Sequence, residues 1–304
     1  DPTIRITNSD TTLAADQLIG ALEFEKTDGS GAGVGVVGGV RMFSEGSIGQ
    51  STYLAFSSSS ASTNNVEGFR LDSSQRVLIG NTTSVAVGGT DFAVQLQGTD
   101  FATSSNVVQR YADSTAGGMF AFAKSRNATV GSQTIVQDDD QLGKIRWYGS
   151  NGSNFTSYAA EIEASVDGAP GSGGDTSDMP GRLVFMTTSD GAGAPTERMR
   201  LNRDGDLGIG ETNPINVLSV KGSQDYLVKI KSTDANVALL LEDVNSTASY
   251  NRIGATTHDI HFVTNNSEAM RIDSDQRLLI GHTSSPTDIW GGQENALQVI
   301  GNSW

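Results

Sequence analysis

Apolar and polar residues alternate in short segments along the chain, and the clearest segments come in pairs joined by a polar connection. One pair flanks the connection from Asp72 to Arg76, and alternation of this kind predicts the two strands of a β-hairpin. Because successive side chains point to opposite faces of a strand, the spacing fixes which residues face each other. The expected pairs are Leu71 with Val77, Phe69 with Ile79 and Arg70 with Leu78. One face of the hairpin is then wholly apolar, and the hairpin needs neighbours because a single one is marginal in water.

The same hairpin pattern occurs three times. Its copies align without a gap as FRLDSSQRVLIGNTTS from Phe69, MRLNRDGDLGIGETNP from Met199 and MRIDSDQRLLIGHTSS from Met270, and the first and third share ten of sixteen positions. The copies keep an arginine, an Ile-Gly pair, a later threonine and a preceding glutamate: Arg70, Arg200, Arg271; Ile79-Gly80, Ile209-Gly210, Ile280-Gly281; Thr82, Thr212, Thr283; Glu67, Glu197, Glu268. The expected pairs in the later copies are Met199 with Ile209, Leu201 with Leu207, Met270 with Ile280 and Ile272 with Leu278. This repetition predicts a repeat architecture.

A second short strand that ends in glycine follows each hairpin, at Gly98, Gly222 and Gly301. These glycines predict three units, residues 1–98, 99–222 and 223–304, of which the third is a shortened version. The first two units also match upstream, for example at Gln17-Leu18 and Gln141-Leu142. In the third unit the alternation predicts further strands at Tyr226 to Lys231, Val237 to Leu241 and Asp259 to Thr264.

The composition favours a thin, turn-rich, all-β fold. Leu, Ile, Val and Phe make up roughly 23% of the 304 residues, and glycine contributes 36. So little apolar area does not offset the roughly 1 to 2 kcal/mol per residue that backbone ordering costs if each unit folds by itself. We therefore expect identical chains to supply the missing surface. The fold class predicted is an elongated fibrous repeat architecture of short hairpins and β-sandwich or β-prism-like units.

The charge of the chain argues against several classes of partner. The formal net charge is −15, and none of the 20 basic residues forms a run, so the sequence predicts no nucleic-acid binding. The negative charge also disfavours binding to anionic membrane surfaces, and no apolar run approaches the length of a membrane span. The absence of cysteine excludes disulfides and thiolate metal sites.

Several motifs suggest chemistry, and each has a simpler interpretation. Gly33 to Gly38 matches the dinucleotide fingerprint, but no helix is expected after it, so a loop or tightly packed strand is favoured. Calcium ligation is suggested by Asn202 to Asp206 and by Asp138 to Asp140, yet the first of these is the hairpin connection, where a turn explains its residues. His258 and His261 point to opposite faces if they lie in one strand, and His282 stands alone. The sequence therefore predicts no catalytic residue, no cofactor and no metal site.

Three further runs carry a family resemblance: DDDQLGKIRWYGSNG, AAEIEASVDGAPG and DMPGRLVFMTTSDGAGAPTERMRLNRDGDLGIG. They resemble the repeat of tail-fibre and related receptor-binding proteins of tailed phages, notably marine ones, most strongly over residues 137–222. The resemblance implies a parallel homotrimer, a location outside the cell on the tail of a virion, and a structural and adhesive role without enzymatic activity. It also implies tail or baseplate proteins and a host-surface receptor or glycan as partners.

The resemblance leaves the receptor site open, because such fibres contact receptors through variable tips and no binding residue carries over. Fibres of this family often end in a helical chaperone segment, whereas this sequence ends at Asn302-Ser303-Trp304 without helical heptads. Two alternatives remain. One is a tailspike-like depolymerase that uses paired carboxylates, which 35 acidic residues make too numerous to select. The other is a capsid fibre or head decoration protein with the same shaft.

Overall fold

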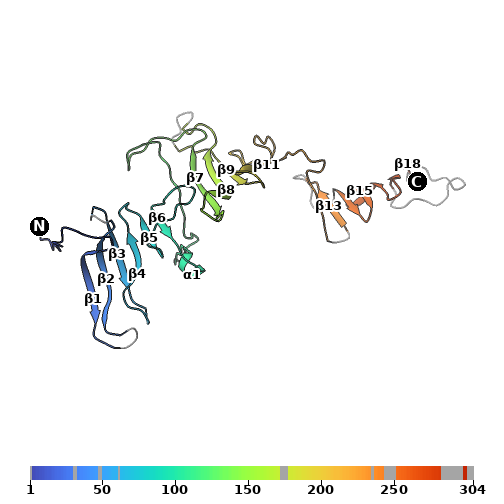
Figure 1. Ribbon diagram of the computed structural model, residues 1–304. Helices are drawn as coiled ribbons and strands as arrows, with labels where there is room; N and C mark the ends of the chain where they lie inside the picture. Colours follow the sequence, from blue (N-terminus) through green and yellow to red (C-terminus); the bar gives the residue numbers. More distant parts are fainter. Residues whose placement is uncertain are drawn as a thin grey trace. The chain divides into compact units, whose positions relative to one another are not determined.

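The alternating segments form the strands of three sheets in the computed structural model of the chain, and each sheet has six strands (Figure 1). The structure describes residues 2–29, 33–46, 50–60, 62–171, 177–233, 236–242, 251–281 and the backbone of 297–299. Two compact units divide the chain, residues 1–221 and 222–304, and the first unit holds two of the sheets. Each strand makes its main contacts with its neighbours in the same sheet, so each sheet is a single layer.

The first sheet follows the chain order of its strands. Neighbouring strands are antiparallel except for the last two, which are parallel. The strands are β1 (Leu18–Lys26), β2 (Gly35–Ser44), β3 (Thr52–Ser58), β4 (Val66–Leu71), β5 (Val77–Ile79) and β6 (Val94–Leu96). A single turn of helix, α1 (Phe101–Ser104), comes next, and the carboxylate of Asp100 accepts a hydrogen bond from the backbone of Thr103 at its start.

The second sheet repeats this topology. Its order is again the chain order, and its last two strands are again parallel. The strands are β7 (Gln141–Gly149), β8 (Ser157–Val166), β9 (Gly181–Thr187), β10 (Thr196–Leu201), β11 (Leu207–Ile209) and β12 (Leu218–Val220).

The third sheet belongs to the second compact unit and has the same topology with shorter strands. They are β13 (Asn236–Leu240), β14 (Arg252–Thr256), β15 (Asp259–Thr264), β16 (Ser267–Ile272), β17 (Leu278–Ile280) and β18 (Leu297–Val299). Two of the three strands predicted for the third unit therefore form, as β13 and β15. The third prediction was wrong, since Tyr226 to Lys231 is not a strand. Its alternation is short, and Tyr226 is 91% exposed, so no sheet buries it.

The predicted hairpins are confirmed residue by residue. The first pairs Phe69 with Ile79, Arg70 with Leu78 and Leu71 with Val77. The second and third pair Met199 with Ile209, Leu201 with Leu207, Met270 with Ile280 and Ile272 with Leu278. The all-β architecture of short hairpins is confirmed with them. Of the three predicted unit ends, Gly98 and Gly222 follow β6 and β12, while Gly301 and His282 lie outside the described residues.

One side chain at the start of each hairpin connection holds the turn. The side-chain oxygen of Asp72 accepts hydrogen bonds from the amides of Ser74 (3.0 Å) and Arg76 (2.9 Å). In the second hairpin, the side-chain oxygen of Asn202 accepts hydrogen bonds from the amides of Asp204 and Asp206. In the third, the side-chain oxygen of Asp273 accepts them from the amides of Asp275 and Arg277. Aspartate and asparagine suit this role because their short polar side chains bond the backbone just ahead of them. The connection at Asn202 thus has the turn function that its sequence suggested.

The repeated glycine after each hairpin has a structural cause. Gly80 and Gly210 have φ angles of 81° and 67°, in the left-handed region that favours glycine. A side chain at either position would also collide with the parallel strand, at the carbonyl oxygens of Gln97 and Lys221. Glycine therefore lets the two parallel strands of each unit close together.

We predict that Gly210→Ala lowers the free energy of unfolding by at least about 2 kcal/mol, because it combines a left-handed backbone with this collision. The measurement is a denaturant unfolding curve. Gly193→Ala is the matched control, since an added Cβ there meets no atom within 4 Å. Equal curves for the two variants would contradict this explanation of the repeat.

Candidate functional sites: an apolar and a charged sheet face

One face of the first sheet is mainly apolar. Following the register across the six strands, this face carries Gly20, Leu22, Phe24, Gly38, Val40, Met42, Leu54, Phe56, Phe69, Leu71, Val77, Ile79, Val94 and Leu96, with Ser44, Thr52 and Ser58 as its polar margin. Many of these side chains lie open to water, with Leu22 and Phe24 60% and 59% exposed. The face is thus an unusually large apolar surface for a single soluble chain.

The other two sheets carry the same apolar face. In the second sheet it consists of Gly143, Ile145, Trp147, Ala160, Ile162, Ala164, Leu183, Phe185, Met199, Leu201, Leu207, Ile209, Leu218 and Val220, with Thr187 as its polar margin. In the third it consists of Val237, Leu239, Ile253, Ala255, Ile260, Phe262, Met270, Ile272, Leu278 and Ile280. Trp147 and Ile260 are 48% and 49% exposed. The apolar face predicted for each hairpin thus continues across the neighbouring strands of its sheet and is polar only at its margins.

The opposite face of each sheet carries an arginine held by a glutamate. Arg70 donates two hydrogen bonds to the carboxylate of Glu67, at 2.6 and 2.8 Å, in the two-pronged geometry that suits a guanidinium. Arg200 and Glu197 form the same fork at 2.6 and 2.7 Å, as do Arg271 and Glu268 at 2.5 Å for both bonds. These are the arginine and glutamate that recur in the sequence.

A β-bulge explains how this glutamate and arginine meet. Residues three apart in a regular strand point to opposite faces, because side chains alternate. In each unit the register shifts by one residue between the glutamate and the strand position that follows it, at Gly68, Arg198 and Ala269. The extra residue returns the glutamate to the face of the arginine. The fork is therefore a repeated structural device.

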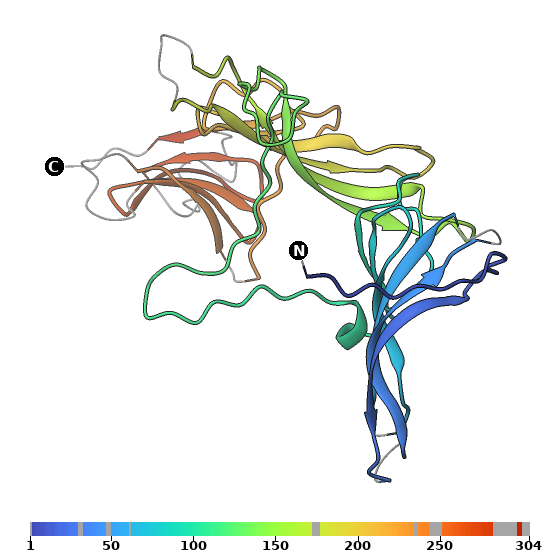
Figure 2. The same cartoon turned by 90° about the vertical axis from the view of Figure 1, so that its left-hand side faces the viewer.

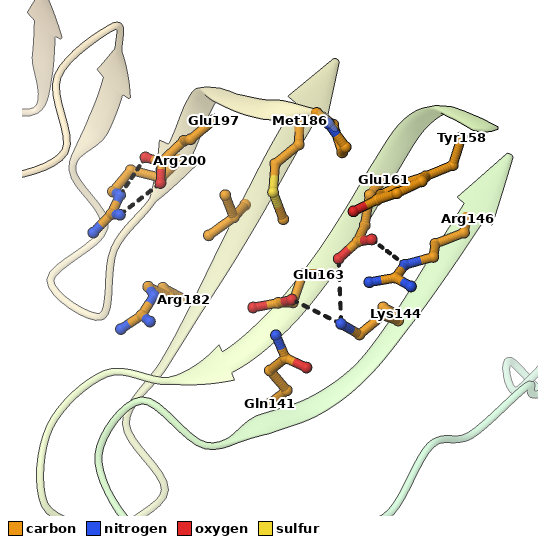
Figure 3. Close-up of a pocket in the computed structure, with 12 residues that line it drawn as sticks. Gln141, Lys144, Arg146, Tyr158, Glu161, Glu163, Arg182, Met186, Glu197 and Arg200 are labelled. Atoms are coloured by element: carbon orange, nitrogen blue, oxygen red, sulfur yellow. Dashed lines mark hydrogen bonds and ion pairs between the residues drawn. The ribbon is translucent and has the colours of Figure 1, made fainter. Parts of the chain in front are cut away.

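The second sheet adds a larger cluster of charges beside its fork (Figure 3). Lys144 and Arg146 on β7 lie opposite Glu163 and Glu161 on β8. Arg146 is ion-paired to Glu161, and the ammonium of Lys144 is 3.4 Å from both glutamates. Glu161 is 3% exposed and Glu163 is 8% exposed, so both charges are buried but paired.

These residues border a cleft of about 270 Å³ on the charged face, together with Tyr158, Arg182, Glu197 and Arg200. Figure 3 shows the forked pair of Arg200 and Glu197 on one side of the cleft. The ion pairs that Lys144 and Arg146 form with Glu161 and Glu163 lie on the other side. The guanidinium of Arg146 stacks over the ring of Tyr158 at 4.8 Å. The side chains around the cleft are thus mostly charged, and ion pairs between them hold them in place.

The protonation of the cluster follows from its contacts. Burial alone would raise the pKa of Glu161, but hydrogen bonding to Arg146 and the charges of Lys144 and Arg146 lower this pKa below its ordinary value of 4.5. Hydrogen bonding to Glu161 in turn raises the pKa of Arg146. Both groups therefore stay charged at neutral pH.

The aspartates considered for calcium have separate partners in the structure. Asp138 accepts a hydrogen bond from the amide of Gly168 at 2.6 Å, Asp139 pairs with Arg182 at 2.7 Å, and Asp140 pairs with Arg126 at 2.7 Å. The pair with Arg126 holds the pKa of Asp140 well below its usual range. Within the described ranges, no group of three or more His, Asp and Glu side chains is placed to hold a metal ion.

The other motifs take structural places. Gly35 to Gly38 begin β2, where a side chain at Gly38 would crowd the carbonyl oxygen of Ser57, so the interpretation as a tightly packed strand holds. His258 lies in the turn between β14 and β15, and His261 lies on the charged face of β15. The premise that both histidines share one strand was therefore wrong. The turn is formed by Thr257 with a positive φ of 57°. A β-branched residue rarely adopts this conformation, so the sequence did not indicate a turn here.

Sequence reasoning missed the charged cluster of the second sheet. Its signal was available, since Lys144 and Arg146 flank Ile145, and Glu161 and Glu163 flank Ile162. Period-two alternation puts each charged pair on one face, and opposite signs on neighbouring strands attract. The pairing of β7 with β8 across a loop was needed to bring the two signals together.

Comparison with known proteins identifies the class of fold. No protein-family model matches the chain, and no curated protein matches it. The chain is similar to the solved structure of the carboxy-terminal domain of the bacteriophage T5 L-shaped tail fibre, with 13% sequence identity and a TM-score of 0.50, over 74% of this chain and 91% of that one. It also matches the structure of that domain with its intra-molecular chaperone domain, at 12% identity and a TM-score of 0.42, over 84% of this chain and 73% of that one.

The first of these likenesses shows that the chain has the fold of a phage tail-fibre domain. Within the residues that the structure describes, no helix has the length and apolar character needed to cross a membrane.

We predict that Arg200→Met lowers the free energy of unfolding by about 1 to 3 kcal/mol, because it leaves the largely buried carboxylate of Glu197 without its partner. Arg200→Lys should not restore the loss, since an ammonium cannot form the fork. In urea unfolding, the double variant Arg200→Met with Glu197→Met should lose less than the sum of the single variants. Additive losses would show that the fork has no coupling energy.

We predict that acid weakens the protein partly through Glu161. A carboxyl with a lowered pKa in the folded state stabilises that state above its unfolded pKa, and this contribution is lost as the pH falls through the folded pKa. Glu161→Gln should therefore lower Tm at about pH 6, and the difference from the unsubstituted chain should shrink towards about pH 3. Glu25→Gln, at an exposed position of β1, is the control. A Tm difference for Glu161→Gln that is constant with pH would refute the assignment.

Proposed function

We propose that the chain is a structural and adhesive part of the shaft of a phage tail fibre, which serves attachment to the host cell. The observation that carries this proposal is the exposed apolar face that recurs on all three sheets. The similarity of fold to the tail-fibre domain of bacteriophage T5 supports it.

The apolar faces support a homotrimer of parallel chains. In a single-layer sheet the apolar face is exposed to water. Its burial would stabilise an oligomer by about 25 cal/mol per Å² of apolar area removed from water. Sister chains that turn their apolar faces towards a shared axis would bury the corresponding sheets of each unit together. This is the prism-like form of the predicted architecture, in which each chain supplies one side.

The charged faces then point outwards, where partners reach them. The charged faces of the three sheets share the forked arginine and glutamate, but their other side chains differ. The first sheet carries the pair of Arg41 and Glu23, and the third carries His261. Proposed partners are other tail or baseplate proteins and a host-surface receptor or glycan. Weak contacts to such a receptor would be multiplied by the number of chains and fibres.

We also propose that attachment to the host is non-covalent and involves no enzymatic activity. A glycosidase of the usual kind needs a carboxylic acid that is protonated near neutral pH, with its pKa raised. The contacts of Glu161, the more buried glutamate of the cleft, lower its pKa instead. Release of reducing sugar from host polysaccharide would contradict this part of the proposal.

We predict that Trp147→Glu disrupts the oligomer, because it places a charge within the proposed apolar interface. The mass of the protein in solution, measured by light scattering, should fall from that of three chains to that of one. Ser153→Glu, which adds the same charge on an exposed loop, should leave the trimer intact. The idea fails if the unsubstituted chain is a monomer, or if both variants assemble equally.

The location and role on the virion need a separate experiment. Antibodies against the chain should label the tail in electron micrographs of virions, and labelling of the head would favour a capsid fibre. The purified protein should also compete with virions for adsorption to host cells. Failure to compete would leave a shaft without an adhesive part.

A further inference from the structure

The segment that leads from the first sheet to the second has no place in either sheet. Residues 105–122, here called the arm, form no strand or helix, and each residue from 101 to 124 is exposed. No backbone hydrogen bond joins residues 105–122 to another described residue. Figure 2 shows the arm as a long green excursion that follows α1 and returns to the second sheet.

The arm is too apolar for a linker that remains in water. Flexible linkers are rich in glycine and serine, whereas the arm carries Val107, Val108, Met119 and Phe120. These side chains are 71%, 55%, 78% and 73% exposed. A Cβ on Gly118 would lie 2.9 Å from a methyl carbon of Val108, so the outgoing and returning halves of the arm approach each other there. Val107 and Val108 lie at this approach on the outgoing half, and Met119 and Phe120 follow Gly118 on the returning half.

The end of the arm already lies on an apolar sheet face. Phe122 covers Gly143 so closely that a Cβ on that glycine would be 2.5 Å from the Cβ of Phe122. Gly143 is the first residue of the apolar face on β7, next to Ile145. The absence of a side chain at Gly143 makes a notch that accepts an apolar side chain from the segment before the sheet.

The first sheet has the same notch. A Cβ on Gly20 would be 2.5 Å from a methyl carbon of Ile6, in the segment that precedes β1. Both glycines directly follow a register shift of the first strand, between Leu18 and Gly20 and between Gln141 and Gly143. Beside Ile6 a hollow of about 430 Å³ remains on the apolar face, bordered mainly by Leu22, Val40, Met42 and Leu54. Leading segments that lie on apolar faces are therefore a repeated feature of the fold, and room for more side chains remains.

We propose that the arm of one chain docks on the apolar sheet face of a second copy of the chain, with Met119 and Phe120 as its principal contacts. This inference rests on the proposed oligomer. Phe122 fills the notch of its own sheet and meets the ring of Phe120 edge-on, with the ring centres 5.2 Å apart. Met119 and Phe120 nevertheless stay 78% and 73% exposed. Sister chains offer the matching surface, since their apolar faces border the axis and the hollow beside Ile6 leaves room there for further side chains. The arm then fastens the chains together between the first and second sheets.

The arm's contacts are tested by photo-crosslinking within the assembled protein. A benzoylphenylalanine replaces Phe120, and chains labelled with ¹⁴N and ¹⁵N are assembled together. Mass spectrometry should find crosslinks between light and heavy chains, and the crosslinked peptides should contain apolar-face residues such as Leu22, Phe24, Ile145 or Trp147. The same probe at Val130, a fully exposed position in the local turn after the arm, should give few crosslinks. Crosslinks confined to single chains would overturn the inference.

A stability measurement gives an independent test. If nothing covers the arm, polar substitutions at such exposed positions change stability little. If the arm is docked, Met119→Ser with Phe120→Ser should lower Tm of the assembled protein by more than about 4 °C, whereas Val130→Ser should not. A trimer whose Tm ignores the double substitution would refute the docked arm and leave the proposed function standing. A monomeric unsubstituted chain would refute the oligomer and the docked arm together.

Discussion

The structure depends on one constraint: an alternating strand in a single-layer sheet has two faces, and this chain makes one of them apolar. In most proteins a second layer from the same chain covers such a face. Here each sheet makes its main contacts along its own strands, and within the described residues no second layer covers it. In the oligomer proposed above, the hydrophobic effect would act on these faces between chains.

The charged face is the counterpart of this arrangement. A sheet without a second layer still needs its strands held in register, and on its apolar face the side chains pack mainly against their neighbours in the same sheet. The repeated fork of arginine and glutamate supplies a fixed contact on the other face, across a bulge that is present in all three units. Arg70 also lies 3.9 Å from the centre of the Tyr53 ring, so the arginine stem and ring share burial. Buried charges of this kind are acceptable because each has its partner.

Glycines shape the places where segments meet. Gly80 and Gly210 let the last strand of a unit approach its parallel neighbour, and Gly20 and Gly143 leave notches on the first strand. In the first two sheets, glycine thus closes one edge and receives the preceding segment at the other. With the arm between the first two sheets, these features link the successive units of one chain and, in the arrangement proposed here, the neighbouring chains of the fibre.

The sequence by itself determined the hairpins, their register and the apolar face, because these follow from period-two alternation over a few residues. It also determined the repeat and its recurring arginine, glutamate and glycine. It did not determine why these residues recur: the fork needs a bulge, and the glycine needs a parallel strand that begins at least eight residues further on. Nor did it locate the cluster of Lys144, Arg146, Glu161 and Glu163, whose parts lie on separate strands. Only the tertiary structure decided these points, since they depend on which distant strands become neighbours.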